Sequence, residues 1–198
     1  MNEALKQFRK HDGYAFLKEL KQNNVHTSSI RRWLEEGVIE KVKPGLYKLS
    51  DMPVLAHQGM IDVCMAMPGA VVCLHSALAF YELTTTVPSS IMIALPRASK
   101  PVKLNYPPMQ VFHFSEANYR TGIENVRAET GGFKIYSREK TIADCFRYRN
   151  KLGLDVAIEG LRNYLNSPGS DVNRLAEIAK SGRMYRVMKP YLEALLQR

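Results

Sequence analysis

The chain has 198 residues and a mass of 22.5 kDa, a length that allows one large domain or two small ones. Its 28 Lys and Arg against 19 Asp and Glu give a net charge of +9, which favours polyanionic partners such as nucleic acid. The 45% hydrophobic and 24% charged residues exclude an intrinsically disordered chain, and no apolar run approaches the roughly 20 residues that cross a bilayer.

The first ten residues contain no apolar core of a secretion signal, so we expect a cytoplasmic protein with no membrane partner. The odd number and wide spacing of Cys64, Cys73 and Cys145 predict buried thiols rather than disulfides. Cys64, Cys73 and His75 do not have the spacing of a structural zinc site, and a fourth ligand is missing. We therefore predict neither a metal nor a cofactor.

The chain begins with the pattern of two short helices. Leu5 and Phe8 lie three residues apart, as one face of a helix requires. Phe16, Leu17 and Leu20 have the same kind of spacing after Gly13 and predict a second helix.

A third helix is predicted from the residues at its ends. Asn24 precedes it, and asparagine tolerates the left-handed backbone of a tight turn. Thr27 is placed to cap its start and Gly37 to end it. Ile30 and Trp33 share one side of this helix, so we expect the opposite, polar and partly cationic side to face solvent.

A β-hairpin is predicted next, from Val38–Val42 and Leu46–Leu49 around the turn at residues 43–45. Helices followed by a basic hairpin are the order of a winged helix-turn-helix, in which one helix enters the major groove and the hairpin reaches phosphates. We expect the hairpin lysines to point away from its apolar residues or to lie at its tip. Winged-helix domains also serve as protein-docking modules, so that role stays open. Glu35 would repel phosphate unless it accepts a hydrogen bond from a cytosine amine. The expected DNA-binding residues are Thr27, Ser28, Ser29, Arg31, Arg32, Lys41, Lys43 and Lys48.

Residues 50–53, Ser-Asp-Met-Pro, have the composition of a domain boundary. We expect a winged-helix domain over residues 1–50 and a second domain over 54–198. Strands followed by a run of helices make the second domain, and the whole chain, α+β with helices at its end. The second domain is predicted to contain helices at 54–67, 75–83, 141–149, 155–165, 171–180 and 184–197, the last broken or kinked at Pro190, and strands at 90–95, 110–114, 122–127 and 133–136, with 71–74 left undecided.

Residues 136–144 collect charged and hydroxyl side chains, as an active site does. A structural interpretation is simpler. Ser137 can cap a helix, and Asp144 can pair with Arg147 or Tyr148 at helical spacing. We therefore predict that the protein is not an enzyme.

Arg183 and Arg186 lie on one side of the terminal helices. A solvated helix face has this appearance. The alternatives are contact with an acidic partner or with a second stretch of DNA backbone.

Residues 13–49 resemble the winged helix of the AbiEi family, the antitoxins of the AbiE abortive-infection systems, above all in their ending, Trp33-Leu-Glu-Glu-Gly-Val-Ile-Glu-Lys-Val-Lys-Pro-Gly-Leu-Tyr-Lys-Leu49. The likeness continues, in the order of that family's second domain, with His75-Ser-Ala-Leu-Ala-Phe-Tyr-Glu-Leu83, Ile91-Met-Ile-Ala-Leu-Pro96 and Tyr136-Ser-Arg-Glu-Lys-Thr-Ile-Ala-Asp144. It covers nearly the whole chain. Asn24 stands where the family usually has glycine.

The resemblance implies a type IV toxin–antitoxin partner with two roles in phage defence. The N-terminal domain would repress its own operon by binding inverted repeats at the promoter. The C-terminal domain would counter the nucleotidyltransferase-like toxin AbiEii without a stable complex. We expect a monomer that binds DNA cooperatively, because no heptad pattern is present. The expected antitoxin surface consists of Arg138, Lys140, Thr141, Asp144, Arg183 and Arg186.

Two other functions remain open on the sequence alone. One is a one-component transcriptional repressor whose second domain binds a small molecule. The other is a nuclease or nucleotide-modifying enzyme that carries a DNA-targeting domain.

Overall fold

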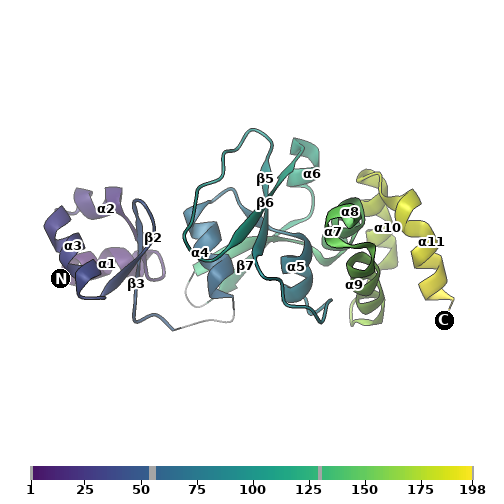
Figure 1. Cartoon of the computed structure of the whole chain (residues 1–198), viewed down its shortest axis with the longest axis horizontal. Coiled ribbons are helices and arrows are strands. Elements are labelled where there is room, and N and C mark those ends of the chain that lie inside the picture. The colour runs from purple at the N-terminus through teal and green to yellow at the C-terminus, as the bar shows by residue number, and fades with distance from the viewer. Residues whose placement is uncertain (1, 54–56, 129–130, 198) are drawn as a thin grey trace. The chain divides into compact units, whose positions relative to one another are not determined.

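The computed structural model describes residues 2–53, 57–128 and 131–197, which form helices and two β-sheets (Figure 1). The fold is mixed α+β and ends in helices, as predicted. The chain divides into two compact units, of which the first is Met1–Pro68 with Pro101–Pro108 and Val126–Phe133, and the second is the remainder. The first unit therefore extends past residues 50–53. In the described ranges no helix combines the length and the apolar character that spanning a membrane requires.

The first unit is built around a three-stranded antiparallel sheet with the strand order β1-β3-β2. The predicted hairpin is confirmed, because β2 pairs with β3. The placement of Phe16 in a helix was wrong. Phe16 ends a strand and pairs with Leu46, a partner that local helical spacing cannot reveal. The elements are α1 (Asn2–Lys10), β1 (Tyr14–Phe16), α2 (Leu17–Gln22), α3 (Thr27–Glu35), β2 (Ile39–Lys43), β3 (Leu46–Leu49) and α4 (Gln58–Ala66).

The turns around α3 largely follow the prediction. Asn24 has a φ of 58° and Gly37 a φ of 67°, so both adopt the left-handed backbone expected of them. Thr27 does not cap the helix. The extended residue before the helix is His26, and Thr27 is already the first helical residue.

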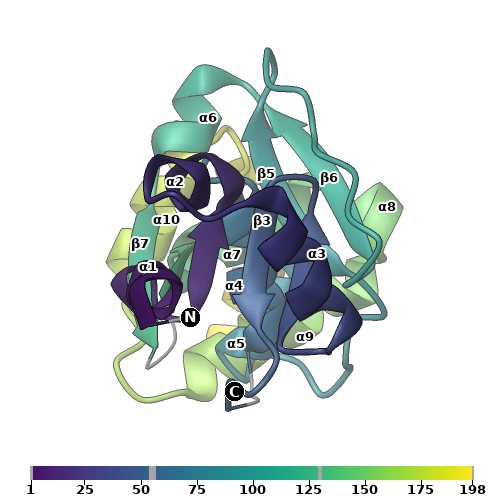
Figure 2. The same cartoon turned by 90° about the vertical axis from the view of Figure 1, so that its left-hand side faces the viewer.

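Helices α1, α2 and α3 lie around β3 in Figure 2, and one face of the sheet packs against them. Phe8, Leu20, Ile30, Trp33 and Tyr47 belong to the buried cluster on this side. Successive residues of a strand point to opposite faces, so Leu46 and Lys48 lie on the other face from Tyr47. That other face meets α4, as the hydrogen bonds below show. The first sheet is therefore covered on both sides.

The second sheet has five strands in the order β6-β5-β4-β8-β7. Its middle strand is the two-residue segment Val71–Val72, which the sequence left undecided, and it runs antiparallel to β5 and parallel to β8. The elements from here on are β4 (Val71–Val72), α5 (Leu74–Phe80), β5 (Ile91–Pro96), β6 (Met109–Phe114), α6 (Glu116–Arg120), β7 (Ile123–Ala128), β8 (Gly131–Tyr136), α7 (Arg138–Arg147), α8 (Arg149–Leu152), α9 (Leu154–Asn166), α10 (Val172–Ser181) and α11 (Tyr185–Leu196).

Most predicted elements of the second domain are present, with shifted ends. Residues 54–56 of the predicted helix 54–67 lie outside the described residues, and α4 begins at Gln58. The short helices α6 and α8 were not predicted, because four or five residues carry too little periodicity. Pro190 does not break α11, which continues to Leu196.

Helix α7 is the centre of the second unit's core, since α5, α9 and α10 all contact it. Its residues Ile142 and Phe146 are completely buried. Cys64, Cys73 and Cys145 are buried and form no disulfide among the described residues, as predicted.

Candidate functional site

The exposed side of α3 presents hydroxyl and basic side chains. Thr27, Ser28, Arg31 and Arg32 are exposed and Ser29 is half-buried. Their orientation follows from Ile30 and Trp33, which are 2% and 7% exposed on the opposite side of the helix. Packing of the apolar side therefore fixes a polar side that is free for a partner.

Acidic residues lie at the end of the same helix. Arg32 Nε is 3.8 Å from Glu36 Oε1, and both side chains are more than half exposed. An ion pair this exposed contributes little free energy, so Arg32 can leave it for a stronger anion.

The three hairpin lysines differ in their surroundings. Lys41 is exposed, and within the described part of the chain its ammonium group makes no ion pair or hydrogen bond. Lys43 donates to the carbonyl oxygen of Ala66 at 2.7 Å. Lys48 Nζ lies 3.0 Å from Asp62 Oδ2 and 3.6 Å from Glu40 Oε2. Of the three lysines, Lys41 alone has no partner among the described residues that would compete with phosphate.

The prediction that Lys48 points away from the apolar residues of the hairpin was wrong for Leu46. Lys48 and Leu46 are two residues apart on β3 and share a face of the sheet, the one that α4 covers. The alternation of side chains along β3 already places Lys48 and Leu46 on one face. The pattern did not show that α4, which follows later in the sequence, covers that face.

A hydrogen-bonded network surrounds Asp62, which is 4% exposed. The Tyr14 hydroxyl donates to Asp62 Oδ1 at 2.5 Å, and Gln58 Nε2 donates to the Tyr14 hydroxyl at 2.7 Å. Burial, together with the Asp62 carboxylate, raises the pKa of Tyr14. Lys48 supplies the positive charge that this buried carboxylate requires.

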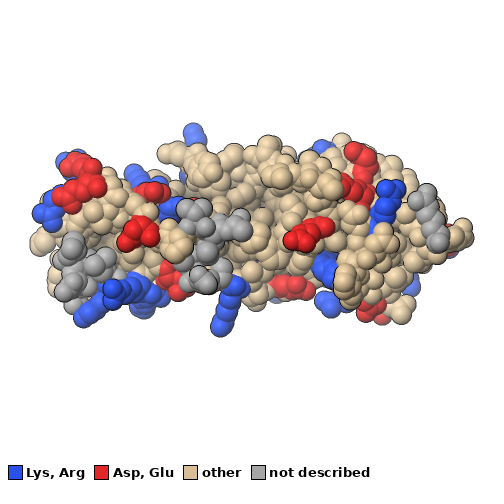
Figure 3. Space-filling model, turned by 90° about the horizontal axis from the view of Figure 1, so that it is seen from below, with Lys and Arg blue, Asp and Glu red and all other residues tan. Residues whose placement is uncertain are grey.

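Basic and acidic side chains are interspersed in small groups on the face of the molecule drawn in Figure 3. No large patch of either sign covers the described residues visible there. Binding of a polyanion to this face would therefore rest on individual residues.

Two of the expected antitoxin residues serve the fold of the second unit. Thr141 is completely buried, and its hydroxyl donates to the carbonyl oxygen of Tyr136 at 3.2 Å. Arg138 donates to the carbonyl oxygen of Pro168 at 3.1 Å, donates to Ser167, and lies over the ring of Tyr164. The predicted cap is confirmed, because Ser137 accepts a hydrogen bond from the backbone N–H of Lys140.

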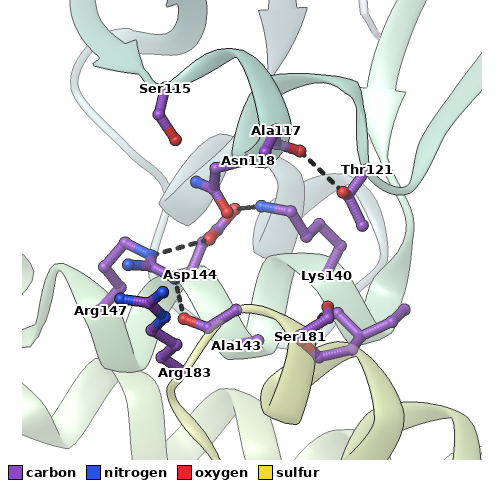
Figure 4. Close-up of a pocket in the computed structure, with 12 residues that line it drawn as sticks. Ser115, Ala117, Asn118, Thr121, Lys140, Ala143, Asp144, Arg147, Ser181 and Arg183 are labelled. Atoms are coloured by element: carbon purple, nitrogen blue, oxygen red, sulfur yellow. Dashed lines mark hydrogen bonds and ion pairs between the residues drawn. The ribbon is translucent and has the colours of Figure 1, made fainter.

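Two other expected antitoxin residues form the floor of a pocket of about 430 Å³ (Figure 4). Lys140 and Asp144 are neighbours on α7, with side chains only 3% and 2% exposed, and the lysine donates to Asp144 Oδ2. The predicted pairing with Arg147 is also present, since Arg147 Nε lies 3.5 Å from Asp144 Oδ1. Burial lowers the pKa of Lys140 and raises that of Asp144, and the attraction between the two charges opposes both shifts.

Arg183 lies on the rim of the same pocket, at the end of α10. It is exposed, and in the described ranges its guanidinium makes neither a hydrogen bond nor an ion pair. Arg186 lies outside this pocket, in a neighbouring hollow that Lys180, Tyr185 and also Arg183 line. The fold thus brings together Lys140, Asp144 and Arg183 of the expected antitoxin residues.

The sequence did not indicate the other wall of the pocket. Ser115 and Asn118 come from the start of α6, more than twenty residues before Lys140. In Figure 4 the Asn118 amide lies beside Asp144. Nothing in the local pattern of residues 115–121 pointed to α7, and only the fold places them opposite it.

Comparison with known proteins identifies the fold alone. No family model matches the chain, and no curated protein matches it. Among solved structures, the crystal structure of the RV2827C protein from Mycobacterium tuberculosis is similar, with a TM-score of 0.56 and 14% sequence identity over 96% of this chain and 79% of that one. The arrangement of helices and sheets is therefore shared with a known structure.

Proposed function

We propose that residues 2–49 form a winged helix-turn-helix domain that binds double-stranded DNA through α3. The observation that supports this proposal most is the exposure of hydroxyl and basic side chains on α3. Arg31 and Arg32 can reach base edges, and Thr27 and Ser28 can donate to phosphates, because Ile30 and Trp33 turn the opposite side inward. The four-residue turn between α2 and α3 and the β2–β3 hairpin after α3 support it.

In this proposal the hairpin acts mainly through Lys41. Lys43 and Lys48 already have partners in the protein, so they would not make close phosphate contacts. Ser29 is half-buried and borders the interface.

We further propose that the chain is the antitoxin of a type IV toxin–antitoxin system and represses its own operon. This rests on the resemblance of both parts of the chain to the AbiEi family. Residues 54–198 would oppose a nucleotidyltransferase-like toxin without a lasting complex. The protein would act in the cytoplasm as a DNA-binding monomer and not as an enzyme.

The test separates repression from protection in the full-length chain. The double variant Arg31→Ala/Arg32→Ala should bind promoter inverted repeats at least about tenfold more weakly, because each good base contact contributes on the order of 1–3 kcal/mol. It should lose repression of a promoter reporter while still rescuing growth of cells that express the toxin from the neighbouring gene. Arg162→Ala removes an exposed arginine from α9 and is the matched control.

Unchanged promoter affinity in the double variant would reject α3 as the DNA interface. Loss of rescue together with repression would show that protection acts through transcription. A neighbouring gene that does not encode a nucleotidyltransferase-like protein would reject the antitoxin assignment.

The second candidate function is a repressor that responds to a small molecule. The pocket between α6, α7 and the end of α10 favours it, because a cavity lined by several polar groups is typical of a ligand site.

A further inference from the structure

We propose that the pocket formed by α6, α7 and the end of α10 binds the phosphoryl group of a small organic molecule, and that Arg183 is its principal recognition residue. This goes beyond DNA binding by α3, and neither proposal depends on the other.

The charges in the pocket favour an anionic ligand. Both oxygens of Asp144 are already engaged, Oδ2 by Lys140 and Oδ1 by Arg147. Three basic side chains line the pocket, including Arg183, against this one carboxylate. Among the pocket's residues, two positive charges therefore remain uncompensated, and a phosphate dianion would neutralise both.

Arg147 has a structural task, whereas Arg183 does not. The guanidinium of Arg147 donates to the carbonyl oxygen of Gly182 as well as contacting Asp144. This ties the end of α7 to the end of α10. Arg183 is the basic side chain of the pocket whose guanidinium makes no hydrogen bond or ion pair with another described residue.

The backbone holds Arg183 in a defined place. Its φ is 58°, its N–H donates to the carbonyl oxygen of Lys180 at 2.9 Å, and the N–H of Met184 donates to that of Ala179 at 2.7 Å. This is the left-handed ending of a helix, a position that usually carries glycine. Here the residue is Arg183, whose planar guanidinium can donate two parallel hydrogen bonds to a phosphoryl group.

Further groups suit the remainder of a ligand. Ser115 is exposed at the rim and can donate to a phosphoryl oxygen. Ala117, Ala143 and Ile178 add apolar surface. The volume of about 430 Å³ falls within the range of pockets that take whole organic ligands, and inorganic phosphate would occupy only a part of it.

Isothermal titration calorimetry on the full-length protein tests this at constant ionic strength. The ligands are a nucleoside monophosphate, inorganic phosphate and the uncharged nucleoside. We expect the monophosphate to bind more tightly than phosphate, and the nucleoside to bind weakly or not at all. Arg183→Gln should weaken monophosphate binding about tenfold or more, since a hydrogen bond between charged groups is lost. Arg162→Gln, at an exposed arginine of α9, should leave it unchanged.

Four results would overturn the proposal. The monophosphate could fail to bind at millimolar concentration, or it could bind Arg183→Gln as tightly as the unchanged protein. The uncharged nucleoside could bind as tightly as the monophosphate, or inorganic phosphate could be the one ligand of the three that binds. A short oligonucleotide that binds through Arg183 more tightly than the monophosphate would identify a nucleic-acid contact instead. Because Arg183 is exposed and its side chain pairs with no other residue that the structure describes, circular dichroism should show that Arg183→Gln folds normally.

Discussion

Lys48 and Tyr14 lie directly opposite each other on neighbouring strands, and both bind the carboxylate of Asp62 on α4. Each uses a different oxygen of that carboxylate. A lysine that the sequence pattern assigned to a phosphate is therefore neutralised within its own unit. Its first role is to hold the hairpin against α4.

Asp62→Ala should lower the free energy of unfolding by about 2–4 kcal/mol, because the Tyr14 hydroxyl and the Lys48 ammonium group lose their shared partner. Urea denaturation followed by circular dichroism measures this. Glu40→Ala removes the exposed partner of Lys48 and should change stability by less than about 1 kcal/mol. Equal effects of the two substitutions would contradict a central role for Asp62.

Lys41→Gln should weaken binding to promoter and random DNA to a similar degree. It should reduce the slope of log affinity against log salt by about one, as loss of a single phosphate contact does. Lys48→Gln should leave that slope unchanged, because its ammonium group is already paired with Asp62. Fluorescence anisotropy over a salt series compares the two, and a larger loss of slope in Lys48→Gln would reverse the assignment.

Asp144→Ala should destabilise the protein by about 3–5 kcal/mol, because it leaves the buried Lys140 ammonium group without its counter-ion. Lys140→Met/Asp144→Leu should recover most of this loss, since apolar side chains of similar size remove both buried charges. Urea denaturation of Asp144→Ala and of the double variant measures how much of the stability is recovered. A double variant no more stable than Asp144→Ala would show that the pair does not act as a unit.

Stability should decrease in strongly alkaline solution. Burial raises the pKa of Tyr164 from 10.0 to about 12, and burial also raises that of Tyr136. A group with a raised pKa in the folded state stabilises the fold below its ordinary pKa, and this contribution is lost as the pH rises to the folded value. The contribution of Tyr164 to the free energy of unfolding should therefore be lost between about pH 10 and pH 12.

Urea denaturation over that pH range measures the decrease, and tyrosinate absorbance reports when the rings ionise. Tyr164→Phe should make the decrease shallower. An unchanged profile in this variant would show that Tyr164 does not couple ionisation to folding.

Local rules predicted the parts of the fold in which neighbouring residues determine the structure. Asn24 and Gly37 adopt the left-handed backbone that their residue types allow, and Ser137 caps α7 through a hydroxyl three residues from its partner. Ile30 and Trp33 are buried on the side that helical spacing assigned to them. In each case the decisive contact lies within one turn of helix.

Contacts between distant residues escaped prediction. Phe16 follows helical spacing but is drawn into a strand by Leu46, thirty residues away. The pocket residues Ser115 and Arg183 belong to segments that meet at the pocket only because α6 packs on β5 and α10 packs on α7. A periodic pattern contains no information on which remote element will cover a given face.

The covering of the first sheet by α4 determines where the chain can be divided for separate study. A fragment that stops at Pro53 would leave the hydroxyl of Tyr14 and the ammonium group of Lys48 without their carboxylate, and would bare the fully buried Leu46 beside them. Such a truncated product would present an open apolar sheet face and tend to aggregate. A fragment made to test the proposed DNA binding should retain at least the stretch through Pro68.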